Sequence, residues 1–304
     1  MNQLVLSAAE TAARLPYGAL AQEIELLLQD PSVQVPARLV QALPGGGSLF
    51  VMPALDGRIA ITKLITFTPA NAGTPRATIQ GDVMVFDIAS GRRLMIMDGP
   101  TVTARRTAAV SLLAAKYLAP NPDGTLLIVG AGAQGRAHLD AFVQGLGVRK
   151  VVIASGSIAS AIALASYAES LGIDARVVSD PNAALRTCSL IVTCTPASCV
   201  VIHAAPRTDA FIAAVGAFTP SMVEISPEVC HHIAKTGSVV LDTSYAVHEA
   251  GDLIQAGLDI KEFKSLRDVI ETRPNRESRP VLFKSCGWAG WDLAAARAAQ
   301  APYK

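Results

Sequence analysis

Glycines with a regular spacing at residues 130–135 give the clearest chemical signal of the sequence. The segment Gly-Ala-Gly-Ala-Gln-Gly follows an apolar run at 126–129 and precedes a stretch with helical character. In such a unit Gly130 permits the tight turn, Gly132 lets a pyrophosphate approach the backbone, and Gly135 allows close packing of helix on strand. The alternative is a glycine-rich turn of some other α/β domain. We expect a dinucleotide site that includes Gly130, Gly132, Ala133, Gln134 and Gly135.

The strand that follows this helix ends in serines. Dinucleotide sites selective for NAD carry an acidic residue here, which binds the ribose 2′-hydroxyl. In this chain the strand is followed by Ser155, Gly156 and Ser157, and the nearest acids, Asp140 and Glu169, fall in helical segments. A strand end without a carboxylate does not repel a 2′-phosphate, and serine hydroxyls can donate hydrogen bonds to it. We therefore expect NADPH or NADH as the cofactor, with NADPH favoured. The preference is modest, because this strand end has no arginine to bind a 2′-phosphate.

Three basic residues have surroundings that suit carboxylate binding and proton transfer. A guanidinium offers a planar fork to a carboxylate, which Arg38 and Arg106 could supply. Lys63 lies within an apolar run, where burial would lower its pKa and suit it to acid–base work. On the residues alone, the alternatives are a solvated loop charge for Arg38, a helix-surface charge for Arg106 beside Arg105, and an edge-strand lysine for Lys63.

The middle of the chain alternates apolar runs with helical patterns, which is typical of a doubly wound parallel sheet of the Rossmann type. The predicted strands are 125–129, 150–154, 175–178, 189–193, 211–215 and 238–241, and the predicted helices are 133–146, 158–171, 181–186 and 226–236. Ligands bind such sheets at the carboxyl ends of the strands. We therefore expect Thr195, Pro196 and Val215 to line the nicotinamide end of the site.

The N-terminal part has a different pattern. Helices are predicted within 7–30, where Ser7 begins a capping box, and a further helix from Thr101. Between them lies a predominantly antiparallel sheet with strands at 49–53, 58–68, 81–88 and 93–97. A last helix is predicted at 291–300. The expected fold class is therefore α/β, a Rossmann sheet with a second α+β domain.

Composition excludes several classes of protein. The 304 residues are 51% hydrophobic and 17% charged, with a formal net charge of +1. No basic block indicates a nucleic-acid partner, no apolar run reaches the roughly 18 residues of a membrane span, and the first residues lack the pattern of a signal peptide. Five cysteines without a C-x-x-C pair fit free thiols in the cytoplasm. Five histidines without metal-ligand spacing predict that no metal is bound.

Segments spread over nearly the whole chain are similar to those of one protein family. They are Val35-Pro-Ala-Arg38, Thr62-Lys63, Thr78-Ile-Gln-Gly81, Arg106-Thr-Ala-Ala, Gly130-Ala-Gly-Ala-Gln-Gly135, Gly216-Ala-Phe-Thr-Pro220 and Phe283-Lys-Ser285-Cys-Gly-Trp. On these segments the sequence resembles the ornithine cyclodeaminase/mu-crystallin family, closest to its bacterial Δ1-pyrroline-2-carboxylate reductases. The resemblance implies a homodimer. It also implies a substrate-binding and dimerisation domain (1–119 and 281–304) and an NAD(P)-binding Rossmann domain (120–280), whose boundary matches the Pro/Asn/Gly-rich segment 120–124.

The resemblance also implies roles for single residues. The family uses the positions matching Arg38 and Arg106 for the substrate, and the second also lies near the cofactor. Lys63 is then the expected proton donor or substrate-orienting group. Thr78 is expected to bind substrate or cofactor, and Ser285 to reach the substrate.

The activity implied is NAD(P)H-dependent reduction of cyclic imino acids, Δ1-pyrroline-2-carboxylate to L-proline and also Δ1-piperideine-2-carboxylate to L-pipecolate. Ornithine cyclodeaminases of the family carry an aspartate where this chain has Ala217 or Phe218, which argues against that activity. Asp292 most simply caps the last helix. Because the family has an acidic residue at this position, Asp292 is also a candidate for the site, though a weaker one than the residues named above. The alternatives are an alanine or opine-type dehydrogenase, a cyclodeaminase, and a non-catalytic binding protein like mu-crystallin.

Overall fold

The chain folds into two compact units. The computed structural model describes residues 4–71, 73–74, 76–196 and 198–300. The first unit comprises the described residues up to Arg106 and those from Trp288 onward, and the second runs from Thr107 to Gly287. The first division falls within helix α3 (Gly99–Leu118). The dividing points differ from the expected boundaries at 120 and 280.

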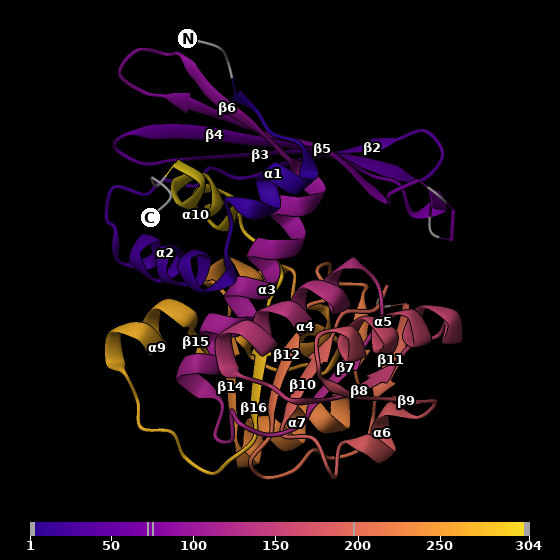
Figure 1. The fold of residues 1–304 in the computed structure, drawn as a ribbon. Coiled ribbons are helices and arrows are strands. Elements are labelled where there is room, and N and C mark those ends of the chain that lie inside the picture. Colours follow the sequence, from indigo (N-terminus) through magenta and orange to yellow (C-terminus); the bar gives the residue numbers. More distant parts are fainter. Residues whose placement is uncertain (1–3, 72, 75, 197, 301–304) are drawn as a thin grey trace. The chain divides into compact units, whose positions relative to one another are not determined.

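A six-stranded sheet forms the first unit, in the order β1-β6-β5-β4-β3-β2 (Figure 1). Its neighbours are antiparallel except β1 and β6. The strands are β1 (Leu4–Val5), β2 (Leu39–Leu43), β3 (Gly47–Leu55), β4 (Ile59–Phe67), β5 (Ile79–Asp87) and β6 (Arg93–Asp98). The expected strands are present, while neither β1 nor β2 was predicted from the sequence. Strand β2 pairs with β3 through a turn in which Gly45 and Gly46 have φ values of 88° and 86°.

Helices cover one face of this sheet. They are α1 (Ala8–Ala13), α2 (Tyr17–Gln29) and α10 (Ala289–Gln300), beside the first part of α3. The short η1 (Pro69–Asn71) lies in the connection between β4 and β5. Helix α10 packs against α2, β3 and β4. The capping box predicted at Ser7 is confirmed, since its side chain and that of Glu10 exchange hydrogen bonds with each other's backbone N–H. Side chains alternate along β4, where Ile61, Lys63 and Ile65 are buried and Leu64 is 40% exposed.

The second unit contains an eight-stranded parallel sheet in the order β15-β14-β16-β12-β10-β7-β8-β9 (Figure 1). Its strands are β7 (Leu126–Val129), β8 (Lys150–Ala154), β9 (Asp174–Val178), β10 (Leu190–Thr193), β12 (Phe211–Ala214), β14 (Ser238–Leu241), β15 (Lys264–Ser265) and β16 (Val281–Lys284). A separate parallel pair joins β11 (Ser198–Ile202) to β13 (Val223–Ile225). Its helices are α4 (Ala133–Leu146), α5 (Ile158–Ser170), α6 (Pro181–Ala184), α7 (Pro227–Thr236), α8 (Gly251–Gln255) and α9 (Leu266–Thr272), with η2 (Ser244–His248) and η3 (Ile260–Glu262).

The doubly wound parallel sheet expected from the sequence is confirmed. Each of its six predicted strands lies within one residue of an observed strand at either end. The strand order reverses between β7 and β10, because β8 and β9 follow β7 on one side while β10 and β12 lie on the other. Dinucleotides bind at the carboxyl ends of the strands beside such a reversal.

The position of strand β16 corrects the expected domain boundary. Residues 281–304 were expected in the first domain, yet 281–284 pair with β12 and β14 in the middle of the parallel sheet. The four residues Val-Leu-Phe-Lys are all buried there. A short apolar strand gains more from a place covered on both faces than from a sheet edge. The second unit therefore extends to Gly287.

Candidate functional site

The glycine turn between β7 and α4 has the geometry that a dinucleotide site requires. Gly130 has a φ of 115°, and a Cβ there would lie 2.7 Å from the carbonyl oxygen of Cys194. A Cβ on Gly135 would collide with the carbonyl oxygen of Gly130, so α4 approaches the turn closely. Gly132 is exposed, with nothing within 4 Å of its Cβ position, and no side chain caps α4. The N–H groups of the first turn, near Ala133 and Gln134, therefore face an open space that suits a phosphate.

Serine hydroxyls surround the carboxyl end of β8, the neighbour of β7. Ser157 is the N-cap of α5, and its Oγ accepts a hydrogen bond from the N–H of Ser160. The hydroxyl of Ser160 donates to Ser157 Oγ at 3.1 Å, and the N–H of Ser157 donates to Ser155 Oγ at 3.3 Å. Gly156, Ser157 and Ser160 are exposed. Residues 155–160 contain no carboxylate, as the sequence indicated.

Thr195, Pro196 and Val215 follow two neighbouring strands at their carboxyl ends. Thr193 of β10 pairs with Ala214 of β12 in register. The N–H of Val215 donates to the carbonyl of Thr193 at 2.9 Å. The structure therefore brings the loops that carry Thr195 and Val215 together at the edge of the sheet where cofactors bind.

Lys63 and Arg106 share a buried carboxylate in the first unit. Lys63 Nζ lies 2.8 Å from Asp292 Oδ2 and 3.1 Å from Oδ1, and Arg106 Nε lies 3.3 Å from Oδ1. Strand β4 presents Lys63 on its covered face, where α10 packs with Asp292 in its first turn. Lys63 is 1% exposed, Arg106 is 6% exposed and Asp292 is 0% exposed.

The cluster has an excess of positive charge. Burial lowers the pKa of Lys63 to about 8, the Asp292 carboxylate opposes this, and the guanidinium groups of Arg106 and Arg38 lower the pKa further. Arg38 comes directly before β2, with its guanidinium carbon 5.9 Å from the ring centroid of Phe50. Because the one carboxylate of Asp292 faces the cations of both Lys63 and Arg106, the cluster favours binding of an anion.

The other two predicted substrate residues, Thr78 and Ser285, form hydrogen bonds within their own units. Thr78 is half-buried just before β5, and its carbonyl accepts from the N–H of Thr68 at 2.8 Å. Ser285 is buried in the second unit, and its hydroxyl donates to Asp242 Oδ2 at 2.8 Å. The same oxygen accepts from the N–H groups of Cys286 and Gly287. Asp242 thus stabilises the turn after β16. The Ser285 hydroxyl donates its hydrogen bond to this carboxylate.

Sequence reasoning underrated Asp292 and missed Glu224. The sequence context of Asp292 predicts mainly a helix cap, whereas in the structure it is the shared partner of Lys63 and Arg106. Glu224 is fully buried in β13 and accepts hydrogen bonds from Thr193, Thr195 and Gly216. The one sequence signal for it is an acidic residue between Val and Ile in an apolar strand.

Neither a metal centre nor a membrane helix is found in the described part of the chain. Across residues 4–300, apart from the undescribed positions, no three His, Cys, Asp or Glu side chains gather so as to hold a metal ion. None of the helices seen there has the length and apolar character to cross a bilayer.

Comparisons with known proteins identify the family of the chain. A sequence model of the ornithine cyclodeaminase/mu-crystallin family matches residues 1–301. The chain is 36% identical over 304 residues to Δ1-pyrroline-2-carboxylate reductase 1 of Burkholderia multivorans, covering 97% of this chain and 94% of that protein. The fold matches Thermococcus litoralis Δ1-pyrroline-2-carboxylate reductase in complex with NADH and L-proline (TM-score 0.89, 23% identity, 98% and 96% of the two chains). It also matches an archaeal alanine dehydrogenase dimer with bound NAD (TM-score 0.87, 25% identity, 98% and 95%). The chain therefore belongs to the ornithine cyclodeaminase/mu-crystallin family.

Proposed function

We propose that this protein is an NAD(P)H-dependent ketimine reductase that converts Δ1-pyrroline-2-carboxylate to L-proline and, as a second substrate, Δ1-piperideine-2-carboxylate to L-pipecolate. The observation that carries the proposal is the buried cluster of Lys63, Arg106 and Asp292 with its excess positive charge. The glycine turn at Gly130–Gly135 supplies the second requirement, a dinucleotide cradle. The 36% identity to the Burkholderia reductase supports the same activity.

Carboxylate binding is the first task of the cluster. Arg38 and Arg106 offer guanidinium groups, which match a carboxylate with two parallel hydrogen bonds. Fixing the carboxylate also fixes the imine carbon, which is bonded directly to the carboxylate carbon. Orientation of this kind can supply roughly 7–11 kcal/mol of the barrier reduction.

Proton delivery is the second task, and we assign it to Lys63. A protonated imine accepts a hydride at carbon far more readily than a neutral imine does. With its pKa lowered to about 8, Lys63 is mostly protonated at pH 7 and still acidic enough to give its proton to the ring nitrogen. Asp292 keeps the ammonium in place and favours its charged form. A reduced nicotinamide, when bound, supplies the hydride.

We propose NADPH as the modestly preferred cofactor. The hydroxyls of Ser155 and Ser157 and the absence of a carboxylate from residues 155–160 support this preference. Residues Thr195, Pro196 and Val215 are the proposed contacts of the nicotinamide half.

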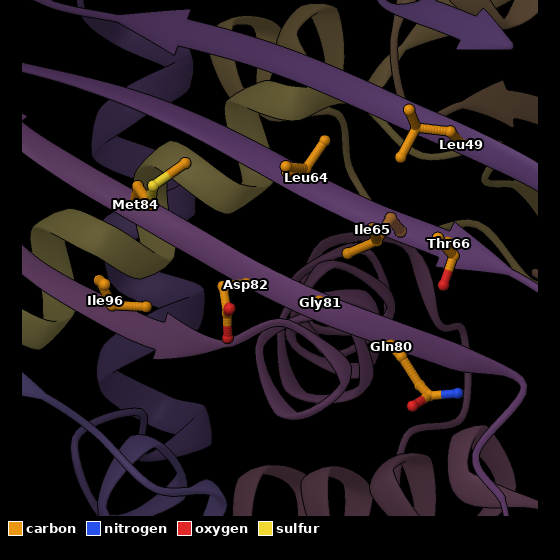
Figure 2. A pocket seen from close by; sticks show the side chains of 9 residues that line it. All are labelled: Leu49, Leu64, Ile65, Thr66, Gln80, Gly81, Asp82, Met84 and Ile96. Atoms are coloured by element: carbon orange, nitrogen blue, oxygen red, sulfur yellow. The ribbon is translucent and has the colours of Figure 1, made fainter.

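We also propose that the protein is a homodimer formed through the open face of the six-stranded sheet. A shallow hollow of about 440 Å³ lies on this sheet. Its lining includes the apolar Leu49, Leu64, Met84 and Ile96 and the polar Thr66, Gln80 and Asp82 (Figure 2). By strand alternation, Leu64 points away from the covered face that holds Lys63. Apolar side chains gathered on an exposed sheet face and bordered by polar ones are typical of a protein interface. The archaeal alanine dehydrogenase of the same fold is a dimer.

We place the protein in the cytoplasm. All five cysteines, among them the exposed Cys199, are free thiols. Free thiols persist in a reducing compartment.

The test is a panel of assays on the purified protein with NADPH and NADH in parallel. Oxidation of either cofactor by freshly prepared Δ1-pyrroline-2-carboxylate, with proline formed, is expected. Oxidation only with pyruvate and ammonia would identify an amino-acid dehydrogenase. Ornithine turnover without net change in NADH would identify a cyclodeaminase, and ligand binding without any turnover would identify a binding protein.

A further inference from the structure

Glu224 is a buried carboxylate that the chemistry proposed above does not use. It lies in β13 and is 0% exposed. Its Oε1 accepts hydrogen bonds from the N–H of Thr195 at 2.7 Å and from the Thr195 hydroxyl at 2.8 Å. Its Oε2 accepts from the Thr193 hydroxyl at 2.9 Å and from the N–H of Gly216 at 2.8 Å. Each oxygen of the ionised carboxylate thus has two donors, and two of the four are backbone N–H groups that can only donate.

These four donors belong to the ends of two neighbouring strands. Thr193 ends β10, Thr195 begins the loop after it, and Gly216 follows β12. A Cβ on Gly216 would lie 2.5 Å from the carbonyl oxygen of Thr195 and would also collide with the carboxylate of Glu224. The two loops are therefore pressed together around one carboxylate, at the edge where a Rossmann sheet binds its ligand.

A second ion pair holds Glu224 itself. Asp252 Oδ1 accepts from the N–H of Glu224 at 2.6 Å and from that of Ile225 at 2.9 Å. Asp252 Oδ2 lies 2.8 Å from Lys284 Nζ, and both side chains are 0% exposed. Burial raises the pKa of Glu224, whereas the nearby Lys284 ammonium lowers it. The ammonium thus offsets part of the cost of burying the carboxylate.

We propose that Glu224 is a positioning residue for the dinucleotide, which fixes the loops of Thr195 and Gly216 in the conformation that receives the nicotinamide half. This inference rests on the cofactor assignment within the proposed function. The adenosine half depends on other elements, namely the glycine turn after β7 and the serines after β8. Loss of the Glu224 carboxylate should therefore weaken binding of the whole dinucleotide and leave binding of its adenosine half unchanged.

The test measures binding of NADPH and of adenosine 2′,5′-bisphosphate to the full chain by calorimetry, without any imine present. In E224Q an amide N–H₂ would meet N–H or hydroxyl donors, so at least one buried bond is lost. We expect the Kd for NADPH to rise about tenfold, with the Kd for the bisphosphate unchanged. The matched control is Ile233→Ala, a buried substitution in α7 of the same unit, which should lower the melting temperature and leave both Kd values unchanged.

Two results would overturn the inference. One is a folded E224Q that binds NADPH as the wild type does, and the other is an equal loss of NADPH and bisphosphate binding. If E224Q does not fold, Thr193→Val removes one donor and keeps the carboxylate. It should raise the Kd for NADPH about threefold, and an unchanged Kd would contradict the inference. A wild type that binds NADPH but does not reduce the imine would refute the proposed function alone.

Discussion

Lys63 on β4 and Asp292 on α10 lie 229 positions apart in the chain, and their charged atoms are 2.8 Å apart in the core of one unit. Breaking one member of such a buried pair leaves an uncompensated charge. A buried ion pair is therefore stable only when its charged groups have enough partners. Here Arg106 provides the Asp292 carboxylate with a second one. This triad is the basis of the proposed chemistry and of the first two predictions.

Replacing Lys63 by methionine should remove the proton donor while keeping most of the side-chain volume. We expect kcat to fall by roughly 10²–10⁴-fold, the range for loss of a general acid. Steady-state kinetics on a variant shown to be folded by circular dichroism provide the measurement. Lys235→Met, at an exposed position in α7, is the control and should keep wild-type turnover. A Lys63→Met enzyme with most of its turnover would remove Lys63 from the mechanism.

The pH profile should report the Lys63 ammonium. Because the protonated form is the active one, activity should be lost as the pH rises through about 8, the pKa of Lys63 in the free protein. In Asp292→Asn the carboxylate that raises this pKa is absent, so the alkaline limb of kcat/KM should move to lower pH. Asp123→Asn, at an exposed loop position, should leave the limb in place. An alkaline limb at the same pH in Asp292→Asn would contradict the coupling.

His138 should make the protein less stable in mild acid. It is fully buried, and burial lowers its pKa to about 4 from the usual 6.5. Between these values the unfolded chain binds a proton that the folded chain does not, so stability is full above pH 6.5 and falls as the pH drops toward 4. The loss amounts to about 3 kcal/mol. Urea unfolding of His138→Gln between pH 4 and 7 should show a flatter dependence, whereas the exposed His231→Gln should follow the wild type. A variant that keeps the full slope would assign the acid sensitivity to other groups.

Cofactor choice should depend on the end of β8. A carboxylate introduced by Ser155→Asp would repel a 2′-phosphate and accept from a 2′-hydroxyl, so we expect the ratio of kcat/KM for NADPH to that for NADH to fall about tenfold or more. Ser166→Asp, exposed farther along α5, adds the same charge as a control. An unchanged ratio in Ser155→Asp would refute the proposed 2′-phosphate site.

The proposed dimer should depend on Leu64. A lysine there would place a charge in the middle of the open sheet face and should convert the dimer to a folded monomer, as measured by light scattering after gel filtration. Ile162→Lys, on α5 and 54% exposed, changes an equally apolar surface residue and should leave the dimer intact. A Leu64→Lys protein of unchanged mass would place the interface elsewhere.

The glycine turn could be predicted because its requirements are local. Gly130 needs a positive φ and Gly135 needs to approach its carbonyl, and both conditions follow from a short strand–turn–helix segment. The six predicted parallel strands follow equally from the sequence, since they are short apolar runs bounded by turn residues. Periodicity and turn chemistry therefore determine much of the second unit.

The rest depends on contacts between distant segments. Asp292 has the sequence context of an ordinary helix start, and only the packing of α10 on β4 gives it Lys63 as a partner. Glu224 in Val-Glu-Ile resembles an exposed position of an edge strand, yet the fold buries it beneath two loops. Likewise Val281–Lys284 could equally have joined either sheet, and its place between β12 and β14 is set by the other strands. Such burial is a property of the tertiary structure, which local pattern does not encode.

The most direct test of the central claim is transfer of the label from NADPH deuterated at C4 of the nicotinamide, on the transferred face, to Δ1-pyrroline-2-carboxylate, with the product analysed by mass spectrometry and NMR. The account predicts L-proline that carries one deuterium at its α-carbon, with the oxidised cofactor formed in equal amount. Proline without deuterium, or no proline with either cofactor, would contradict it.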